Sequence, residues 1–175
     1  MMTFDTKVYK SKIFKDVFIF KPSVGIDDRG TIFTTYDKHI YDKYLPKSLS
    51  FIHDKFAESK NNVLRGLHGD IKTWKLVSCI LGEIYEVVVD MRQDSKTYLK
   101  WDSWVLNDKN KFQVLIPPNF VNGYYVMSEK AIFHYKLAYL GEYLDVKDQI
   151  VAKWDDPKLN ILWPCSNPIL QDRDK

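Results

Sequence analysis

The sequence contains few of the residues that build phosphate loops and metal centres. Its 175 residues include only seven glycines, four histidines and two cysteines. No GxGxxG, GxxxxGKS/T or GxSxG motif is present, which excludes the usual dinucleotide, P-loop and nucleophile-elbow loops. The two cysteines, Cys79 and Cys165, form no CxxC pair and no Cys/His cluster, so structural zinc is not expected.

The chain also lacks a long apolar run and a strong excess of one charge. No stretch of about 18 apolar residues suggests a membrane span, and the N-terminus does not resemble a signal peptide. Lys and Arg number 26 against 23 Asp and Glu, a net charge of +3. No concentrated Lys/Arg stripe marks a nucleic-acid surface. We therefore expect a cytoplasmic protein that binds neither nucleic acid nor membrane.

Short apolar and β-branched runs dominate the rest of the sequence. Hydrophobic residues make up 45% of the chain and aromatic residues 15%, and the length predicts a single domain over residues 1–175. The runs recur about every ten residues with turn signals between them, which is typical of an antiparallel sandwich or barrel. Strands are predicted at residues 17–20, 31–36, 50–56, 62–68, 75–81, 83–90, 101–106, 112–116 and 131–138.

Three local features refine this picture. Gly82 separates two runs rich in Val, Ile and Tyr, which predicts a tight hairpin. Residues 37–45 predict one short helix, with Asp37 as N-cap. The last 35 residues look irregular, and Trp154 and Trp163 are expected to pack them over the sheets as a covering segment.

The histidines are the first candidates for chemistry. His68 has an acid two residues later, Asp70, but no His-x-His pair accompanies it, so a catalytic metal is not expected. Arg65 and His68 nominally face opposite sides of a strand, and a bulge at Gly66 would bring both into one cavity. Such a site suits proton transfer, which needs a base, an opposed acid and a positive group. A hydrogen-bonded core histidine remains the alternative.

Two further side chains have both a functional and a structural interpretation. Lys75 begins the most apolar run and either stabilises an oxyanion or extends to solvent. Strand alternation places Phe133 and Tyr135 on one face, opposite His134 and Lys136, so Tyr135 is either a phenolic acid or ordinary aromatic core.

Eight short motifs follow one another along the chain. They are Asp27-Asp28-Arg29-Gly30, Val63-Leu64-Arg65-Gly66-Leu67-His68, Lys75-Leu76-Val77 with Gly82-Glu83, Val89-Asp90-x-Arg92-x-x-Ser95-x-Thr97, Ile116-Pro117-x-x-Phe120, Tyr135-Lys136, Trp154-Asp155-Asp156-Pro157 through Ile161-x-Trp163-Pro164, and Asp172-Arg173-Asp174. Taken in this order, they resemble the dTDP-4-dehydrorhamnose 3,5-epimerase family from Val17 to Asp174. The resemblance implies an all-β, cupin-type jelly roll with short helices and a covering C-terminal segment.

Within the family the chain is most similar to epimerases that act on GDP-linked 4-keto-heptoses in bacterial capsule synthesis. The stretches that carry this likeness are His53-Asp54-Lys55-Phe56, His68-Gly69-Asp70 with Lys72-Thr73-Trp74-Lys75, Tyr135-Lys136-Leu137-Ala138-Tyr139, and Gly141-Glu142-Tyr143-Leu144-Asp145. The dTDP-sugar enzymes usually have Tyr-Gln where this chain has Gly69-Asp70.

The resemblance implies a mechanism of proton abstraction beside the C4 ketone. His68 corresponds to the catalytic base and Asp174 to the carboxylate that orients it. Lys75, with Arg65, would stabilise the enolate oxygen. Tyr135 would return a proton from the opposite face of the ring. No metal or redox cofactor is implied.

Substrate binding is implied for Arg29 and Lys55, which correspond to positions that face the nucleotide diphosphate. In the family, part of this site comes from a second subunit, because N-terminal strands are exchanged in a homodimer. A homodimer that binds a nucleotide sugar is therefore expected.

Departures from the family pattern affect the second inversion. Asn122 replaces a common histidine, Gly141 stands where a second tyrosine is found, and Thr34 replaces a glutamate. Tyr139 is a candidate substitute for the second tyrosine, and Asn122 remains a substrate-binding candidate.

The sequence thus predicts an epimerase that inverts C3 of a nucleotide-linked 4-keto sugar, with inversion at C5 left open. GDP-4-keto-heptose is the preferred substrate. The alternatives are a dTDP-4-dehydrorhamnose 3,5-epimerase, a 3,4-ketoisomerase and a non-catalytic sugar-nucleotide-binding cupin.

Overall fold

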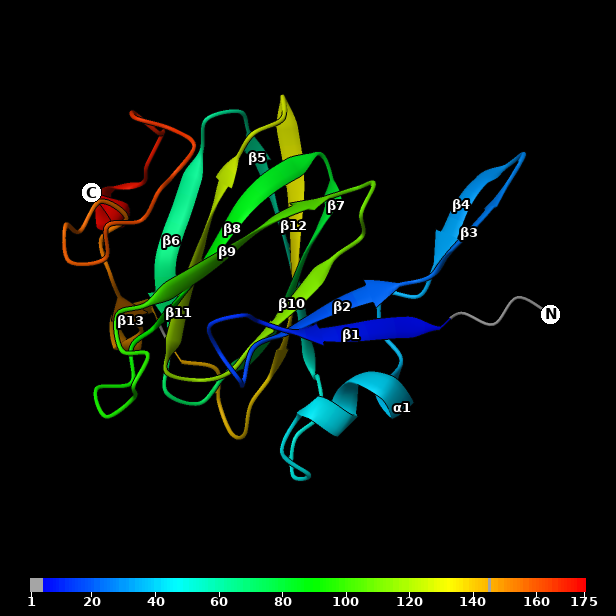
Figure 1. Cartoon of the computed structure of the whole chain (residues 1–175), viewed down its shortest axis with the longest axis horizontal. Coiled ribbons are helices and arrows are strands. Elements are labelled where there is room, and N and C mark those ends of the chain that lie inside the picture. The colour runs from blue at the N-terminus through cyan, green and yellow to red at the C-terminus, as the bar shows by residue number, and fades with distance from the viewer. Residues whose placement is uncertain (1–4, 145) are drawn as a thin grey trace.

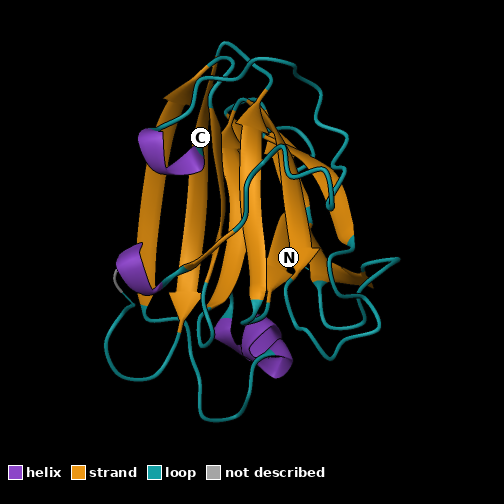
Figure 2. Ribbon diagram, turned by 90° about the vertical axis from the view of Figure 1, so that its left-hand side faces the viewer, coloured by secondary structure: helices purple, strands orange, loops and turns teal. Residues whose placement is uncertain are grey.

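Two antiparallel sheets face each other in a β-sandwich (Figures 1 and 2). The computed structural model describes residues 5–144 and 146–175. The strands are β1 (Thr6–Lys10), β2 (Phe18–Pro22), β3 (Val24–Asp27), β4 (Gly30–Phe33), β5 (His53–Lys60), β6 (Leu64–Gly69), β7 (Trp74–Leu81), β8 (Glu83–Asp90), β9 (Trp101–Asn107), β10 (Gln113–Ile116), β11 (Phe120–Val126), β12 (Lys130–Ala138) and β13 (Ile150–Val151). The helices are α1 (Lys38–Tyr41) and the 3₁₀ turns η1 (Asp42–Tyr44), η2 (Val146–Asp148) and η3 (Asp172–Asp174).

The strand order is that of a jelly roll. One sheet has the order β1-β2-β10-β7-β12-β5 and the other β13-β6-β11-β8-β9, while β3 and β4 form a separate hairpin. The all-β, cupin-like fold predicted from the sequence is therefore confirmed.

The main core lies between the two sheets. It contains Val77 of β7, Ile84 and Val88 of β8, and Phe120 and Tyr124 of β11. Alternation along β8 sends Val87 and Val89 to the opposite face, where the C-terminal segment covers them. Both faces of this strand are thus buried, which explains its nearly continuous apolar run.

The C-terminal segment covers the second sheet as predicted. Trp163 packs against the outer apolar cluster, its ring centroid 6.0 Å from that of Tyr85. Its indole Nε1 donates to the backbone oxygen of Trp154 at 2.8 Å. Trp163 therefore fixes a segment that has little regular structure, and Trp154 contributes its backbone oxygen to this contact.

The predicted hairpin at Gly82 is wrong. β7 pairs with β10 and β12, whereas β8 pairs with β9 and β11 in the other sheet. Gly82 has φ +79°, and a Cβ there would lie 2.1 Å from the Lys130 backbone oxygen. The glycine therefore carries the chain around a corner from one sheet to the other, because two fully buried strands each need neighbours on both sides.

Other local predictions are confirmed or incomplete. Asp37 caps α1 by accepting a hydrogen bond from His39 N at 2.8 Å, and the helical region ends before Pro46. Strand β11 was not predicted, because two buried faces remove the alternation that marks a strand. Strands β1, β3 and β13 were also not predicted.

The β3–β4 hairpin projects away from the sandwich (Figure 1). Its Ile26 and Ile32 side chains are 72% and 61% exposed. The predicted turn at residues 27–30 forms its tip, where Asp27 pairs with Gly30. The hairpin is an exposed arm with an apolar surface.

Two sequence predictions touch residues outside the described part of the chain. These are the first four residues of the N-terminus and Asp145 in the heptose-like motif. Among the described residues, no helix is long and apolar enough to cross a membrane.

Candidate active site

One pocket of about 260 Å³ opens into the sandwich between the two sheets. Its wall includes side chains from both sheets and from the C-terminal segment. Predicted site residues in the wall are Lys55, Arg65, His68, Lys75, Asn122 and Tyr135. The structure therefore gathers positions that lie up to 80 residues apart in the sequence.

Strand β6 brings Arg65 and His68 into the same pocket, as the bulge prediction required. The register between β6 and β11 shifts between the pairs His68–Asn122 and Arg65–Tyr124. Gly66 lies at this irregularity with φ +121°, and a Cβ on it would be 2.5 Å from the Gly123 Cα. The close backbone approach therefore requires glycine, and it turns both flanking polar side chains inward.

His68 is hydrogen-bonded to the C-terminal turn. Its Nε2 lies 2.6 Å from Asp174 Oδ1, and Asp174 is only 3% exposed. Burial acts to raise the pKa of Asp174, but the hydrogen bond and charge of His68 hold it below the ordinary value. A neutral imidazole that donates Nε2–H to this carboxylate keeps Nδ1 as its basic nitrogen. The C-terminal turn is thus folded back over the sheet with Asp174 buried, while Asp172 and Lys175 remain exposed.

Arg173 contacts the same histidine nitrogen. Its Nε lies 3.0 Å from His68 Nε2 and 3.7 Å from Asp174 Oδ1, and its second guanidinium arm donates to Gln149 Oε1 at 3.0 Å. Nε2 accepts from Arg173 only when it has no proton and donates to Asp174 only when it has one. The tautomer of the His68 ring therefore selects the partner of Nε2.

Lys75 projects from β7 into the pocket and not to solvent. Its Nζ donates to the His68 backbone oxygen at 2.8 Å and to Asn122 Oδ1 at 2.9 Å. Burial lowers the pKa of the Lys75 ammonium to about 8. Below that pH the pocket holds a positive charge next to His68.

Tyr135 enters from the sheet opposite His68. It pairs with Val77 of β7 and Lys55 of β5, so these three side chains share one face of the sheet. The Lys55 Nζ lies 6.0 Å from the Tyr135 ring centroid and 4.4 Å from that of Tyr143. Burial raises the pKa of Tyr135, which keeps the phenol protonated at neutral pH. A base and a phenolic acid therefore reach the pocket from two sheets.

Two predicted binding residues lie outside the pocket. Arg29 stands at the tip of the β3–β4 arm, where its side chain is 90% exposed and pairs with Asp27 at 2.5 Å. Tyr139 bonds to His53 Nδ1 at 3.1 Å and does not line the pocket. The expectation that Tyr139 fills the place of a second active-site tyrosine is therefore not supported by its position.

The sequence interpretation missed several pocket residues. Tyr143 lines the wall, and burial raises its pKa to about 12. Arg173 was passed over although it is adjacent to Asp174. Glu86 lies behind the wall and belongs to no recognisable sequence motif. The only available signal was its even spacing with Ile84 and Val88, which places an acid between two apolar residues on one face of the strand.

The fold and the pocket define a jelly-roll protein with a site suited to proton transfer. A basic imidazole, an ammonium and a phenol converge on one cavity, which is the set that enolisation of a carbonyl compound requires. Within residues 5–144 and 146–175, no three His, Cys, Asp or Glu side chains form a cluster that could hold a metal ion.

Comparison with known proteins identifies the family. The sequence profile of the dTDP-4-dehydrorhamnose 3,5-epimerases matches residues 11–175. The chain is 36% identical over 170 residues to the enzyme of that name from Shigella flexneri, covering 95% of this chain and 92% of that protein. It is 37% identical over 163 residues to the Pseudomonas aeruginosa enzyme, covering 91% and 88%.

Solved structures agree with the sequence comparison. The dTDP-6-deoxy-D-glucose-3,5-epimerase of Legionella pneumophila, crystallised with dTDP-4-keto-L-rhamnose, superposes with a TM-score of 0.89 at 31% identity, covering 97% of this chain and 90% of that one. The Bacillus anthracis epimerase, with TDP and pyrophosphate bound, gives 0.88 at 31% identity and 97% coverage of both chains. The chain belongs to the dTDP-4-dehydrorhamnose 3,5-epimerase family and is an isomerase.

Proposed function

We propose that this protein inverts C3 of a nucleotide-linked 4-keto sugar by proton abstraction and return on opposite faces of the ring. The observation that carries the proposal is the one pocket that His68, paired with Asp174, enters from one sheet and that Lys75 and Tyr135 enter from the facing sheet. Binding alone does not require a base and an opposed acid.

Each side chain then has one role. The C4 ketone acidifies the C3 hydrogen, and the unprotonated nitrogen of His68 removes it. The electron pair moves into an enolate, whose oxygen the Lys75 ammonium stabilises, with Arg65 as a second donor. Tyr135 donates its phenolic proton to C3 from the other face, which inverts that centre. Exchange with solvent then removes the proton from His68 and restores it to Tyr135, so the protein returns to its starting state.

The nucleotide sugar that the relatives support is a dTDP-linked 4-keto-6-deoxyhexose. The Legionella pneumophila structure contains dTDP-4-keto-L-rhamnose, and the Shigella flexneri and Pseudomonas aeruginosa relatives are named for dTDP-4-dehydrorhamnose. We therefore propose this class first. The preference for GDP-4-keto-heptose drawn from the sequence has no support in these relatives.

GDP-4-keto-heptose is retained as the second candidate because of particular residues in the pocket. Asn122, in place of the family's common histidine, lines the wall and is the smaller side chain, whereas Gly141 does not line it. Asn122 cannot titrate as a histidine can, so we propose inversion at C3 first. Tyr143 is a second phenol in the wall and leaves inversion at C5 open.

We also propose that the active form is a homodimer of single-domain chains in the cytoplasm. The pocket of about 260 Å³ lies at the small end of the range for ligand sites, of order 300–1,000 Å³, and is too small for a whole nucleotide sugar. Arg29 does not line its own pocket and lies on an arm that projects from the sandwich (Figure 1). An arm exchanged between subunits would place an arginine near the diphosphate of the neighbouring site.

Proton NMR in D₂O tests the proposal with the dTDP-4-keto-6-deoxyhexose and the GDP-4-keto-heptose side by side. We expect deuterium at C3 and a new C3 diastereomer from one of the two substrates. Deuterium at both C3 and C5 would show that the second inversion is retained. Migration of the carbonyl to C3 would indicate a 3,4-ketoisomerase, and binding without exchange would indicate a non-catalytic cupin.

A further inference from the structure

Glu86 is a fully buried acid directly behind the pocket, and the proton-transfer mechanism does not use it. It projects from β8 between the two sheets with 0% exposure. Its Oε1 accepts a hydrogen bond from Asn122 Nδ2 at 2.8 Å. Its Oε2 is buried without a hydrogen-bond partner among the described residues.

The Asn122 carboxamide links this acid to Lys75. While Nδ2 donates to Glu86, Oδ1 accepts from Lys75 Nζ at 2.9 Å. A carboxamide has one acceptor and one donor end, so fixing one end fixes the other. If the amide turned over, its NH₂ group would face the Lys75 ammonium, and two donors would oppose each other.

The surroundings of Glu86 favour its neutral acid form. A buried carboxylate with only one donor is costly, because burial penalises a charge more than a single unsatisfied hydroxyl. Burial raises the pKa of Glu86 to about 8 against the opposing effects of Asn122 and Lys75. The other titratable groups that interact with it are Cys79 of β7 and Tyr124 of β11, and neither is positively charged.

We propose that Glu86, as a neutral acid, is a positioning residue that acts through Asn122 to aim Lys75 at the reacting oxygen. The arrangement holds the Lys75 amine in place without neutralising it, so that the full positive charge is left for the enolate. A charged carboxylate at this distance would instead compete with the enolate for the ammonium. This inference rests on the proposed function of Lys75.

The test compares Glu86→Gln with Glu86→Leu. The E86Q variant keeps a neutral side chain with an acceptor oxygen, whereas leucine of similar size has no acceptor. We expect E86Q to retain kcat within about threefold, and E86L to lose kcat by about tenfold to a hundredfold with KM changed less than about threefold, as expected for a misplaced catalytic group. Glu83→Leu, on the same strand but bonded to Asn107, is the matched control and should keep full activity.

A second measurement needs no substrate. Trace acetylation of the free protein across a pH series, followed by mass spectrometry, gives the pKa of Lys75. We expect E86Q to leave this pKa near that of the parent chain and E86L to lower it, because Asn122 is then free to turn. If E86L fails to fold, Asn122→Leu, which breaks the link from its other side, should lower the pKa in the same way.

Two results would overturn the inference. An equal loss of activity in E86Q and E86L would mean that Glu86 acts as a charge, and an unchanged Lys75 pKa in E86L and in N122L would mean that the link has no effect. If the parent chain epimerises neither nucleotide sugar, the proposed function fails, while the labelling experiment still decides the role of Glu86.

Discussion

Strand β8 carries two buried acids whose environments differ. Glu86 and Asp90 lie four residues apart on the same face of the strand, and both have 0% exposure. Asp90 accepts hydrogen bonds from five donor groups, whereas Glu86 accepts one, from Asn122. Their pKa values move in opposite directions, to about 2 for Asp90 and about 8 for Glu86.

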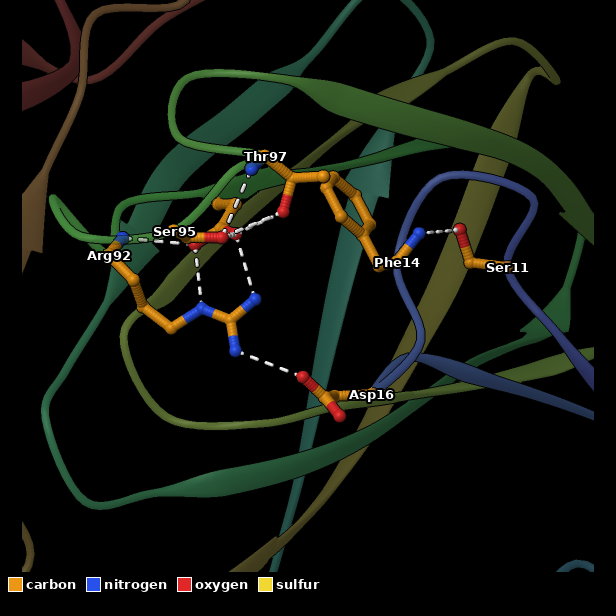
Figure 3. A network of polar contacts seen from close by, with 7 residues as sticks. Ser11, Phe14, Asp16, Arg92, Ser95 and Thr97 are labelled. Atoms are coloured by element: carbon orange, nitrogen blue, oxygen red, sulfur yellow. Dashed lines mark hydrogen bonds and ion pairs between the residues drawn. The ribbon is translucent and has the colours of Figure 1, made fainter.

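The Asp90 cluster holds the β8–β9 connection together. The Asp90 side chain accepts from the Arg92 guanidinium at 2.8 and 2.9 Å, from Ser95 at 2.7 Å and from Thr97 at 2.6 Å. Figure 3 shows Arg92, Ser95 and Thr97 in this network, with Asp16 bonded to the free side of the guanidinium at 3.0 Å. Burial acts to raise the pKa of Asp90, but these donors outweigh it.

The comparison separates a structural cluster from a functional one. Where every lone pair of a buried acid is satisfied, the charge is stable and the loop is fixed. Where a buried acid and a buried amine are left with few partners, both pKa values move towards neutrality, as they do for Glu86 and Lys75. Groups that exchange protons, or that stabilise a charge formed during the reaction, are typically buried with few partners and have shifted pKa values.

The largest effect expected is on chemistry, from His68→Asn. We expect inversion at C3 to fall by about 10³- to 10⁴-fold, as for loss of a general base, with little change in the free energy of unfolding. Initial rates by NMR and urea unfolding measure the two quantities. A His68→Asn variant that lost stability but kept its rate of inversion would show that His68 has a structural role instead.

Asp90→Ala should show the opposite pattern. It leaves Arg92 without its main partner and several hydroxyl groups unpaired, so we expect a loss of about 3 kcal/mol in the free energy of unfolding. The rate per folded molecule should stay within about threefold of the parent, because Asp90 does not line the pocket. Urea titration with activity measured at saturating substrate checks both values. A large loss of kcat in a stable D90A protein would contradict the assignment of Asp90 to a structural cluster.

Tyr135→Phe tests the opposed acid. We expect inversion to fall by about 10²-fold or more, since a positioned proton donor contributes about 10²- to 10⁴-fold. Tyr124→Phe, whose hydroxyl lies 3.4 Å from Ser59, is the matched control, because Tyr124 lines the same pocket from β11 on the facing sheet. Equal losses in the two variants would assign the effect to packing and not to proton donation.

The pH dependence of stability sharpens the comparison between the two acids. Asp90 has a folded pKa of about 2, below its ordinary value of 3.8, so its contribution of about 2 kcal/mol is present above pH 4 and is lost as the pH falls towards 2. Glu86 has a folded pKa of about 8, above its ordinary value of 4.5, so its contribution is present below pH 4.5 and is lost as the pH rises towards 8.

Two variants measure these opposite slopes. In Asp90→Asn, the unfolding free energy should no longer rise with pH between pH 2 and pH 4 through this acid. In Glu86→Gln, it should no longer fall with pH between pH 4.5 and pH 8. A parent protein whose stability is flat across both windows would show that neither acid has a shifted pKa.

Much of the fold could be predicted from the sequence because most strands alternate or form short apolar runs. The corner at Gly82 could not, since a glycine between two apolar strands is compatible with a hairpin and with a crossover between sheets. The local sequence pattern does not indicate which other strands will pair with the apolar segments on either side of Gly82. Strand β11 was missed for the related reason that burial on both faces removes the period of two.

The candidate site was predictable where a residue matches a family motif. His68, Lys75, Tyr135 and Asp174 are all found at or beside one pocket. Glu86 was not predictable, because its importance lies in what it lacks, a second hydrogen-bond donor, and only the folded chain reveals that. The position of Arg29 likewise depends on where the β3–β4 arm points.

The most direct test of the account follows both deuterium and configuration at C3 in D₂O, with the Tyr135→Phe variant and the active nucleotide sugar. If His68 and Tyr135 work on opposite faces, the base should still remove the proton and return a deuteron to the same face. We therefore predict that, in this variant, deuterium exchange with retained configuration is at least about tenfold faster than inversion. This ratio lies within the rate enhancement that one positioned acid supplies. Loss of exchange and inversion in equal measure would contradict the two-face mechanism.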